Sequence, residues 1–323
     1  MASAQDLNRR ITSFGNMRKV TRAMEMVSAA KLRRAQQRIE TLRPFANSIL
    51  EITALVANGI QAASPHPLLA ERETKRVCLL MFTGDRGLAG ALNANVLRRS
   101  LQLEQEWTQR GAEVRWIAVG KKGASSLTFR KFEIDKTFRG ITDWPTFRAA
   151  EEIGQAVIER FTAQDYDKVV LIYNHFDSAM SQTVIVQDLL PLTDDLLALA
   201  LGKIKNIRDL ALTQETALVT NLGIKEGFKR EKESESKHKA DWIFEPDPQE
   251  LLDRLLPTYI EQTCFRALLE STASEHGSRM TAMKSASDNA ADLIDELTLL
   301  RNRVRQAAIT QEILEVVAGA DAL

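Results

Sequence analysis

The chain has 323 residues with 43 basic and 43 acidic side chains, so its formal net charge is zero. This balance excludes a strong overall attraction to nucleic acid or to a membrane surface. Its hydrophobic content of 44% is enough for a buried core, and its length predicts about two domains. Cys78 and Cys264 lie far apart in apolar surroundings, which predicts two buried thiols rather than a disulfide or metal framework. The sequence has neither a signal-peptide pattern nor an apolar run of about 18 residues, so we expect a soluble protein of a reducing compartment.

The first predicted element is a helix of about fifty residues within residues 1–60, with Gly59 as its C-terminal stop. Apolar or small residues recur in steps of three and four, the spacing of a helix packed along a narrow seam. The positions in these steps, of which Lys31 alone is charged, are Leu7, Ile11, Phe14, Met17, Thr21, Met24, Ser28, Lys31, Ala35, Ile39, Leu42, Ala46, Ile49, Thr53 and Val56. Because this period resumes after Pro44, we expect a kink there rather than an end. Residues 1–58 carry ten basic and four acidic side chains, a net charge of about +6, which predicts a solvated face or one that meets acidic partner loops.

Residues 75–192 change from the helical period to short apolar runs, which indicates an α/β, Rossmann-like domain. Three continuous apolar runs have the length of strands, and a fourth segment suits an edge strand. These segments are Val77–Thr83, Val114–Gly120, Lys168–Asn174 and Ser181–Leu192. Helical patterns at Leu92–Arg110 and Trp144–Thr162 separate them. Continuous apolar strands alternating with helices predict a parallel or mixed sheet that is covered on both faces.

Residues 193–240 are interpreted as a variable insertion, because their second half, KEGFKREKESESKHK, mixes charges and suits a solvated, partly disordered segment. Order resumes in residues 241–323. Asp247 is a good N-cap, Pro248 suits the first helical position and Glu250 can close a capping box. We expect Pro257 to kink this helix near its start.

The C-terminal helix repeats the seam pattern of the N-terminal one. Its seam residues are Met280, Met283, Ser287, Ala290, Ile294, Leu297, Val304 and Ala308. Counted from Ala273 to Val317 alone, it would be roughly 65 Å long. A helix of that length needs a long partner, and we predict that the two ends of the chain form one coiled coil with the α/β domain inserted between them.

The sequence motifs predict no active site, cofactor site or metal site. The turn TGDRGLAGALN follows a strand and opens a helix, but the spacing of Gly84, Gly87 and Gly90 fits neither a dinucleotide fingerprint nor a phosphate loop. A tight turn that needs small residues is the better interpretation. The four histidines are scattered, and no Ser, Cys or Thr has a recognisable nucleophile context.

Several long segments resemble the gamma-subunit family of F-type ATP synthases, the central rotor stalk, in its bacterial type. They are MRKVTRAMEMVSAAKLRRAQ, TGDRGLAGALN, HKADWIFEPDPQELL, SRMTAMKSASDNAADLI and RVRQAAITQEILEVVAGA. The chain lacks the cysteine pair of the redox-regulated chloroplast form. The resemblance implies an antiparallel coiled coil inside a ring of alpha and beta subunits, with the α/β domain at the foot of the stalk. It implies a non-catalytic rotor that couples ion flow through the membrane sector to ATP synthesis or hydrolysis.

The resemblance also implies roles for particular residues and partners. Met24 and Arg279 match a coupling pair where the shaft emerges from the ring, and a second set matches positions that meet beta-subunit loops, namely Arg305, Gln306, Thr310 and Glu312. A third set matches the loop that faces the c-ring and the epsilon subunit, namely Trp242, Ile243, Phe244 and Glu245. The implied location is peripheral, on the cytoplasmic face of the bacterial inner membrane.

Two other classes of protein remain as alternatives. One is a stand-alone α/β enzyme with coiled-coil arms for dimerisation, which would need an active-site constellation in the inserted domain. The other is a coiled-coil nucleic-acid binder, which predicts salt-sensitive retention on DNA.

Overall fold

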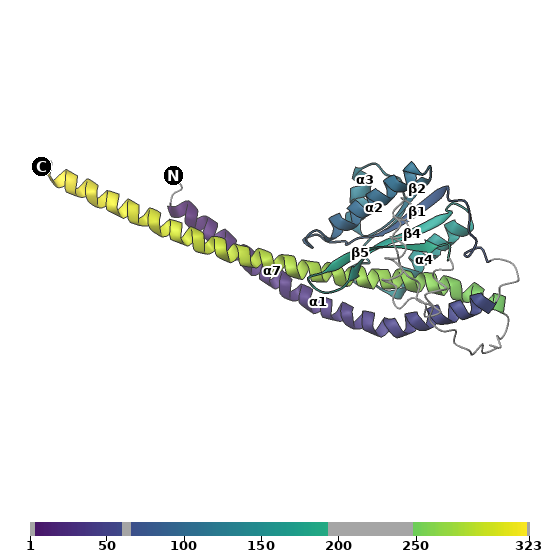
Figure 1. Ribbon diagram of the computed structural model, residues 1–323. Coiled ribbons are helices and arrows are strands. Elements are labelled where there is room, and N and C mark those ends of the chain that lie inside the picture. The colour runs from purple at the N-terminus through teal and green to yellow at the C-terminus, as the bar shows by residue number, and fades with distance from the viewer. Residues whose placement is uncertain (1–3, 60–65, 193–247, 322–323) are drawn as a thin grey trace, which may run out of the picture.

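Two long helices run side by side, and a sheet domain packs against one end of the pair (Figure 1). The computed structural model describes residues 4–59, 66–192 and 248–321. Helix α1 covers Ala4–Gly59 and helix α7 covers Pro248–Asp321, so at about 1.5 Å per residue they are roughly 85 and 110 Å long. They are antiparallel, because Arg301 near the end of α7 donates a hydrogen bond to Asn8 near the start of α1 (3.1 Å).

The seam between the two helices follows a seven-residue repeat, which is the pattern of a left-handed coiled coil. On α1 the buried or half-buried positions include Leu7, Phe14, Thr21, Ser28 and Ala35; on α7 they include Met283, Ala290, Leu297 and Val304. Two predicted seam residues are wrong. Met17 is 50% exposed, because the step from Phe14 to Thr21 passes over it, and Ala308 is exposed, because it lies beyond the start of α1.

The domain is built on a five-stranded sheet with the strand order β3-β2-β1-β4-β5. The strands are β1 Arg76–Phe82, β2 Glu113–Val119, β3 Ile134–Phe138, β4 Lys168–Phe176 and β5 Gln182–Leu190. The first four are parallel, and β5 pairs antiparallel with β4 at the edge. The predicted mixed sheet with a final edge strand is therefore confirmed.

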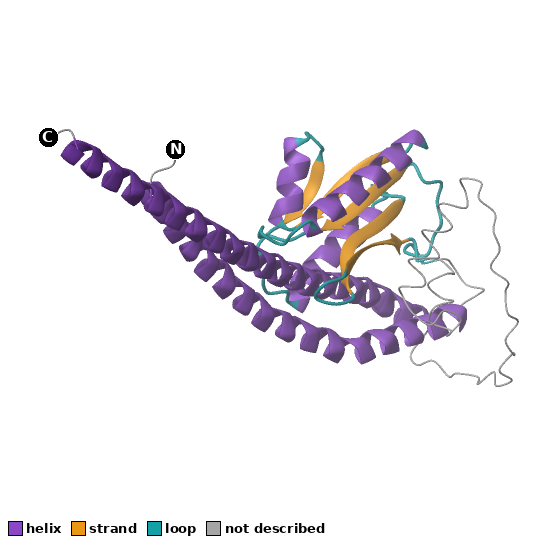
Figure 2. Ribbon diagram, turned by 60° about the vertical axis from the view of Figure 1, so that its left-hand side comes forward, coloured by secondary structure: helices purple, strands orange, loops and turns teal. Residues whose placement is uncertain are grey.

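Helices cover both faces of the sheet, as the continuous apolar strands predicted (Figure 2). Helices α2 Leu92–Gln109 and α3 Lys121–Phe129 cover one face, and α4 Phe147–Thr162 and the first part of α7 cover the other. Residues of β1 alternate between the two cores. Val77, Leu79 and Met81 pack on the α2 and α3 side, and Cys78, Leu80 and Phe82 on the α4 and α7 side.

The first part of α7 belongs to the core of the domain. Buried residues follow one face of the helix at four-residue steps, namely Leu252, Leu256, Ile260, Cys264 and Leu268. Helix α4 approaches closely at Gly154, where an added Cβ would lie 2.9 Å from Glu261 Cγ. The same unbroken helix therefore serves as a core element of the domain and, further along, as one of the two helices of the projecting pair.

Some elements differ from the predictions. Strand β3 was not predicted, because its sequence IDKTF is short and half-exposed; α3 was not predicted, because it has nine residues and contains Gly123. Helix α4 begins at Phe147 rather than Trp144, with Thr146 Oγ1 accepting from the Ala149 backbone (3.3 Å) as its N-cap.

Both long helices contain a proline. Pro44 and Pro257 lie inside α1 and α7, which continue past them as predicted, and α1 is bowed (Figure 2). Pro248 is the first residue of α7, as predicted. The predicted N-cap Asp247 and the predicted insertion 193–240 lie outside the described residues.

Replacing Phe161 by Ala tests the core of the domain. Phe161 is fully buried, whereas Phe129 at the end of α3 is 89% exposed. We expect Phe161→Ala to lower the free energy of unfolding of the full chain by about 3–5 kcal/mol. The matched variant Phe129→Ala should change it by less than about 0.5 kcal/mol. Urea unfolding followed by circular dichroism measures both, and equal effects of the two variants would contradict the assigned core.

Candidate functional site

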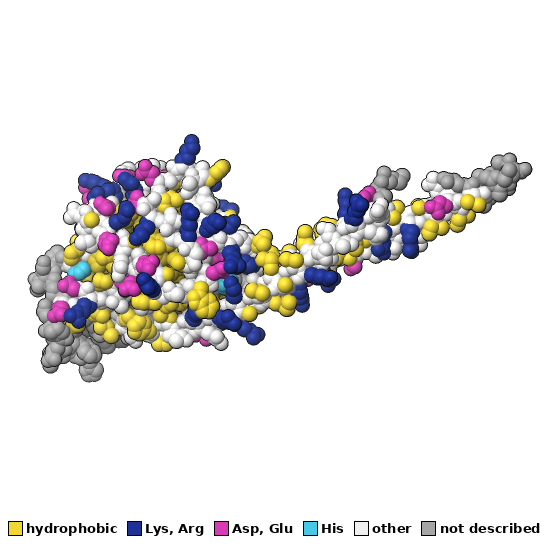
Figure 3. All heavy atoms as spheres, turned by 180° about the vertical axis from the view of Figure 1, so that it is seen from behind, with side chains coloured by type: hydrophobic (Ala, Val, Ile, Leu, Met, Phe, Trp, Pro, Cys, Tyr) yellow, Lys and Arg dark blue, Asp and Glu magenta, His cyan; other side chains and the backbone are white. Residues whose placement is uncertain are grey.

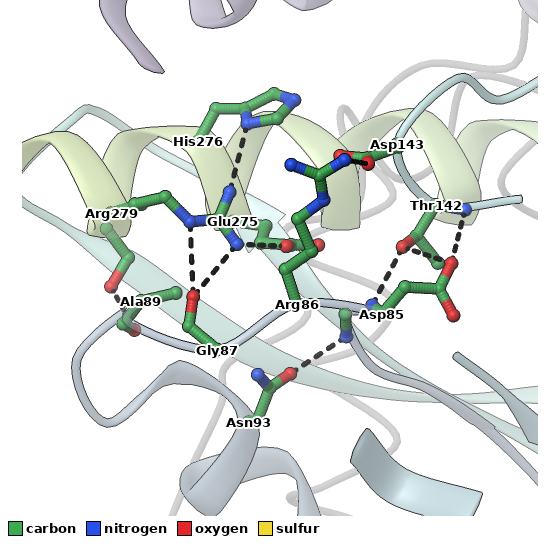
Figure 4. A network of polar contacts seen from close by, with 12 residues as sticks. Asp85, Arg86, Gly87, Ala89, Asn93, Thr142, Asp143, Glu275, His276 and Arg279 are labelled. Carbon is green, nitrogen blue, oxygen red and sulfur yellow. Dashed lines mark hydrogen bonds and ion pairs between the residues drawn. The ribbon is translucent and has the colours of Figure 1, made fainter. Parts of the chain in front are cut away.

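The glycine-rich turn after β1 packs against α7 (Figure 4). Gly84 approaches α7 so closely that an added Cβ would lie 2.5 Å from Glu275 Oε2. The turn is held at its other side by Asn93, whose Oδ1 accepts from the Gly84 backbone (2.8 Å). The turn also contains Leu88 and Gly90, which have positive φ angles of 61° and 55°. The small residues of this turn make room for a helix of the same chain, which explains why their spacing does not match a phosphate loop.

Arg279 of α7 is the centre of this contact and is only 6% exposed. Its Nε and Nη2 atoms both donate to the Gly87 carbonyl oxygen (3.2 Å each), and Nη2 also pairs with the carboxylate of Glu275. Ser278 Oγ donates to the Ala89 carbonyl oxygen (2.7 Å). The guanidinium therefore neutralises a buried carboxylate and closes the turn onto the helix.

His276 completes this group as a neutral imidazole. Its Nδ1 atom lies 3.4 Å from Arg279 Nη1. Because a guanidinium can only donate, Nδ1 accepts and the ring proton is on Nε2. Burial, followed by the positive charges of Arg279 and Lys31, lowers the pKa of His276 to about 4.

The loop that precedes α4 joins the same network. Asp85 Oδ2 accepts from the backbone and hydroxyl of Thr142 (3.1 and 2.9 Å), and Asp85 Oδ1 accepts from the Lys121 backbone (2.9 Å). Burial alone would raise the pKa of Asp85, but hydrogen bonds from Gly140, Thr142 and Lys121 lower it below its usual value. Thr272 on α7 donates to the Thr142 carbonyl oxygen (2.9 Å).

Asp143, the next residue of that loop, connects to α1. Its carboxylate pairs with Arg86 of the turn (2.7 Å) and with Lys31 of α1 (3.3 Å). The two long helices and the domain therefore meet at this level, and Figure 4 shows the residues that the domain and α7 contribute.

The β4–β5 connection holds the same stretch of α7 from another side. Ser274 and Thr281 donate to the carbonyl oxygens of Asn174 (3.4 Å) and Ala179 (3.0 Å). Near Gly277 the helix lies so close that an added Cβ would be 3.1 Å from the Phe176 ring. We call the turn 83–91, the loop 140–143 and the connection 174–181 the collar.

The collar occupies the place where open α/β sheets commonly bind ligands. Strand β1 lies between β2 and β4, so successive connections leave it in opposite directions, and the crevice at the carboxyl ends of β1 and β4 is the usual ligand site. Here residues 270–281 of α7 lie against the segments that leave these strand ends. The part of the domain where a ligand would commonly bind is therefore occupied by its contact with α7.

The sequence reasoning missed Glu275, His276 and Ser278. Their stretch, ESTASEHGSR from Glu270 to Arg279, contains no large hydrophobic residue, yet nine of its ten residues are buried. One signal in the sequence was available: this helix segment is rich in small polar residues, whereas the rest of the seam is apolar. Such side chains can form hydrogen bonds to a backbone that approaches closely.

The described residues offer neither a metal-binding cluster nor a reactive thiol. In residues 4–59, 66–192 and 248–321, no group of three His, Cys, Asp or Glu side chains could hold a metal ion. Burial raises the pKa of the Cys264 thiol to about 12 and that of Cys78 further, so both thiols stay protonated. None of the described helices combines the length and apolar character that a membrane span requires.

Comparison with known proteins identifies the family. The family model described as ATP synthase matches residues 3–323. The chain is 41% identical over 325 residues to the ATP synthase gamma chain of Halothermothrix orenii, with 100% of both chains covered. The chain belongs to the ATP synthase gamma-chain family. The gamma chains of a Picosynechococcus species and of Geobacter metallireducens are 40% and 39% identical, with all of this chain covered and 100% and 99% of theirs.

Solved structures agree with this family membership. The chain is similar to a chain in the central stalk and c-ring structure of the Tetrahymena thermophila mitochondrial ATP synthase, with 28% identity and a TM-score of 0.55 over 83% of this chain and 99% of that one. A chain of the Euglena gracilis mitochondrial ATP synthase rotor matches at 18% identity and a TM-score of 0.56 over 95% and 98%, which supports the fold.

The residues that the gamma-chain resemblance singled out fall into three environments. Met24 is half-buried on α1, and the polar contacts of Arg279 go to Gly87, Glu275 and His276, so the predicted pair of Met24 and Arg279 stays a prediction. The predicted beta-subunit contacts are exposed on the part of α7 that projects beyond α1, namely Arg305, Gln306, Thr310 and Glu312. The predicted c-ring and epsilon contacts lie outside the described residues, namely Trp242, Ile243, Phe244 and Glu245.

The projecting end of α7 is unusually apolar for an exposed helix. Ile309, Ile313, Leu314 and Val316 are 48–72% exposed, and after Glu315 only Asp321 is charged. Hydrophobic and basic side chains also share the surface of the helix pair nearer the domain (Figure 3). Exposed apolar residues gathered at one end of a helix are typical of a surface that contacts another protein.

The buried His276 makes stability depend on pH. As pH falls from 7 to 4.5, the unfolded chain binds a proton at the ordinary pKa of 6.5, and the folded chain does not until about pH 4. The folded state should therefore lose about 2–3 kcal/mol relative to His276→Gln, in which an amide can still accept from Arg279. Free energies of unfolding of both proteins across this range measure the difference, and parallel profiles would contradict a neutral buried His276.

Proposed function

We propose that the chain is the central rotor subunit of an F-type ATP synthase, which couples ion flow through the membrane sector to ATP synthesis or hydrolysis by rotation. The single observation that carries this proposal is the continuity of α7, which is a core element of the domain and also the longer helix of the projecting shaft. A helix of this kind transmits a turning force without a joint. The family membership and the central-stalk likeness support the same function.

In this proposal the chain has no catalytic role. ATP chemistry belongs to the surrounding ring of alpha and beta subunits, and the angle of the shaft biases the affinities of their sites. This is a coupling free energy between rotor angle and nucleotide binding. The filled crevice of the α/β domain and the protonated, buried thiols support a mechanical role.

The proposed partners act on different parts of the chain. Beta-subunit loops would meet the exposed residues Arg305, Gln306, Thr310 and Glu312, and the apolar end of α7 would turn inside the ring. The epsilon subunit and the c-ring would meet Trp242–Glu245, and the α/β domain would form the foot of the stalk. The chain would therefore lie at the cytoplasmic face of the bacterial inner membrane as a peripheral part of the complex.

Copurification tests the proposed function directly. We expect a tagged full-length chain, isolated under gentle conditions from the cells that produce it, to carry alpha, beta and epsilon subunits in fixed stoichiometry. Recovery of the chain alone would contradict the rotor. Salt-sensitive recovery on DNA, or a folded homodimer with a small-molecule turnover, would instead favour one of the two alternative classes.

Met24→Lys tests the proposed coupling position. Met24 is half-buried at the edge of the helix pair, so a lysine there must direct its ammonium group out of the seam and toward whatever surrounds the shaft. We expect the number of ions pumped per ATP hydrolysed to fall several-fold, while the yield of assembled complex stays unchanged. Ion uptake into inverted vesicles and ATP hydrolysis, measured on the same sample, give this ratio.

Phe129→Lys is the control for that experiment. Phe129 is 89% exposed at the end of α3, which covers the face of the sheet opposite α7. The same change of charge should leave the ratio unaltered there. If Met24→Lys also leaves coupling intact, the role assigned to Met24 is wrong even though the chain is a rotor.

A further inference from the structure

A groove of about 720 Å³ runs along α1 beside the α/β domain. One face of α1 forms its first wall, the loop before α4 and the first turn of α4 form the second, and α7 forms its floor. Its lining includes Arg34, Arg38 and Phe45 on α1, Trp144 and Phe147 on the second wall, and Leu269 on the floor. None of the residues that line the groove belongs to the collar.

The groove gathers exposed aromatic rings. Phe45, Trp144 and Phe147 are 53%, 57% and 39% exposed, and Phe147 packs edge-on against Phe265 at a centroid distance of 5.7 Å. Single exposed hydrophobic residues are ordinary, but several around one hollow mark a surface that another molecule covers. The apolar floor at Leu269 would admit hydrophobic side chains of that molecule.

The charge of the groove is of one sign. Among the described residues that line it, the charged ones are Arg34 and Arg38, and neither Asp nor Glu is present. Arg38 is partly engaged: its guanidinium lies 4.3 Å from the centre of the Trp144 ring and donates to the Pro145 carbonyl oxygen (3.3 Å). A guanidinium has five donors, so most remain available for a carboxylate. The complementary ligand is therefore acidic.

The length of the groove favours a helix as its occupant. From Arg34 to Phe45 it follows α1 for twelve residues, which is about 17 Å or three helical turns. Arg34 and Arg38 lie four residues apart on the same face of α1, so they match two carboxylates one turn apart on a facing helix. An amphipathic helix laid in a hydrophobic groove is a recurring recognition mode.

We propose that this groove binds an acidic amphipathic helix of another subunit of the same complex. Its apolar residues at i, i+3 or i+4 and i+7 would fill the space between Phe45, Phe147 and Leu269, and its carboxylates would pair with Arg34 and Arg38. The inference rests on the proposed function, because the occupant is a partner within the assembled synthase. Pairing with α1 of a second copy of this chain is disfavoured, since residues 1–58 carry ten basic and only four acidic side chains.

Photo-crosslinking in the assembled complex tests the inference. Thr41 is an exposed residue of the groove and is replaced by p-benzoylphenylalanine in the full chain. The complex is then purified, irradiated and digested, and the crosslinked peptides are sequenced by mass spectrometry. We expect crosslinks to one helix of another subunit, with a net negative charge and apolar residues at helical spacing. Crosslinks only to a second copy, to lipid, to this chain itself or to a neutral or basic segment would overturn the proposal, as would their absence.

A pair of charge reversals sharpens the test. Arg34→Glu places a like charge opposite the proposed carboxylates, so we expect the crosslink yield to fall at least about tenfold. Arg33→Glu makes the same change on an exposed neighbour outside the groove and should leave the yield unchanged. Equal effects of the two variants would contradict the pairing. A complex that assembles and pumps ions but gives no such crosslink rejects only this inference, whereas a chain that recovers no partner subunits rejects the proposed function as well.

Discussion

The structure depends on one constraint, namely that the single helix α7 must belong both to the core of the α/β domain and to the projecting helix pair. The first part of α7 fills the core beneath the sheet, and the rest pairs with α1 and projects from the domain. Burial of residues such as Ile260 and Leu268 fixes the rotation of α7 about its own axis relative to the sheet, because a turn of the helix would expose them. Any torque on the projecting end is therefore carried to the domain by the same backbone.

The collar adds resistance to twisting where the helix leaves the domain. Hydrogen bonds with fixed geometry add to the apolar packing, because a rotation of α7 would break them. Residues 270–281 of α7 use both kinds of contact, since small side chains permit close approach and polar ones bond to the backbone of the turn and of the β4–β5 connection. The buried pair of Glu275 and Arg279 would be costly if either partner were removed, which ties the turn to one orientation of the helix.

Much of the fold follows from periodicity in the sequence. The helical period of both ends, the three apolar strand runs and the proline-tolerant helices were predictable, because long regular patterns average over local exceptions. Strand β3 and helix α3 were not, since IDKTF and KKGASSLTF are too short and too polar to carry a period. Met17 was placed in the seam by its spacing of three from Phe14, but the supercoil follows sevens and leaves it exposed.

The candidate site was harder to predict than the fold. Arg279 was reached only through the family resemblance, and its partners Glu275 and His276 were missed. A buried polar cluster in a coiled-coil helix depends here on Gly87 of the glycine-rich turn, which lies 192 residues earlier in the chain. The glycines of that turn were understood as small residues in a tight bend, but the helix for which they make room becomes visible only in three dimensions. Tertiary contacts of this kind leave no periodic trace in either segment.

The central claim is that the shaft and the α/β domain turn as one rigid body. It is tested most directly by attaching a gold rod to the domain through Phe129→Cys, which is far more accessible than the two buried native thiols, and immobilising the assembled complex through its alpha and beta subunits. With ATP present, the account predicts that the rod rotates continuously in one direction. A rod that stays still, or only fluctuates, while the same complexes hydrolyse ATP would contradict it.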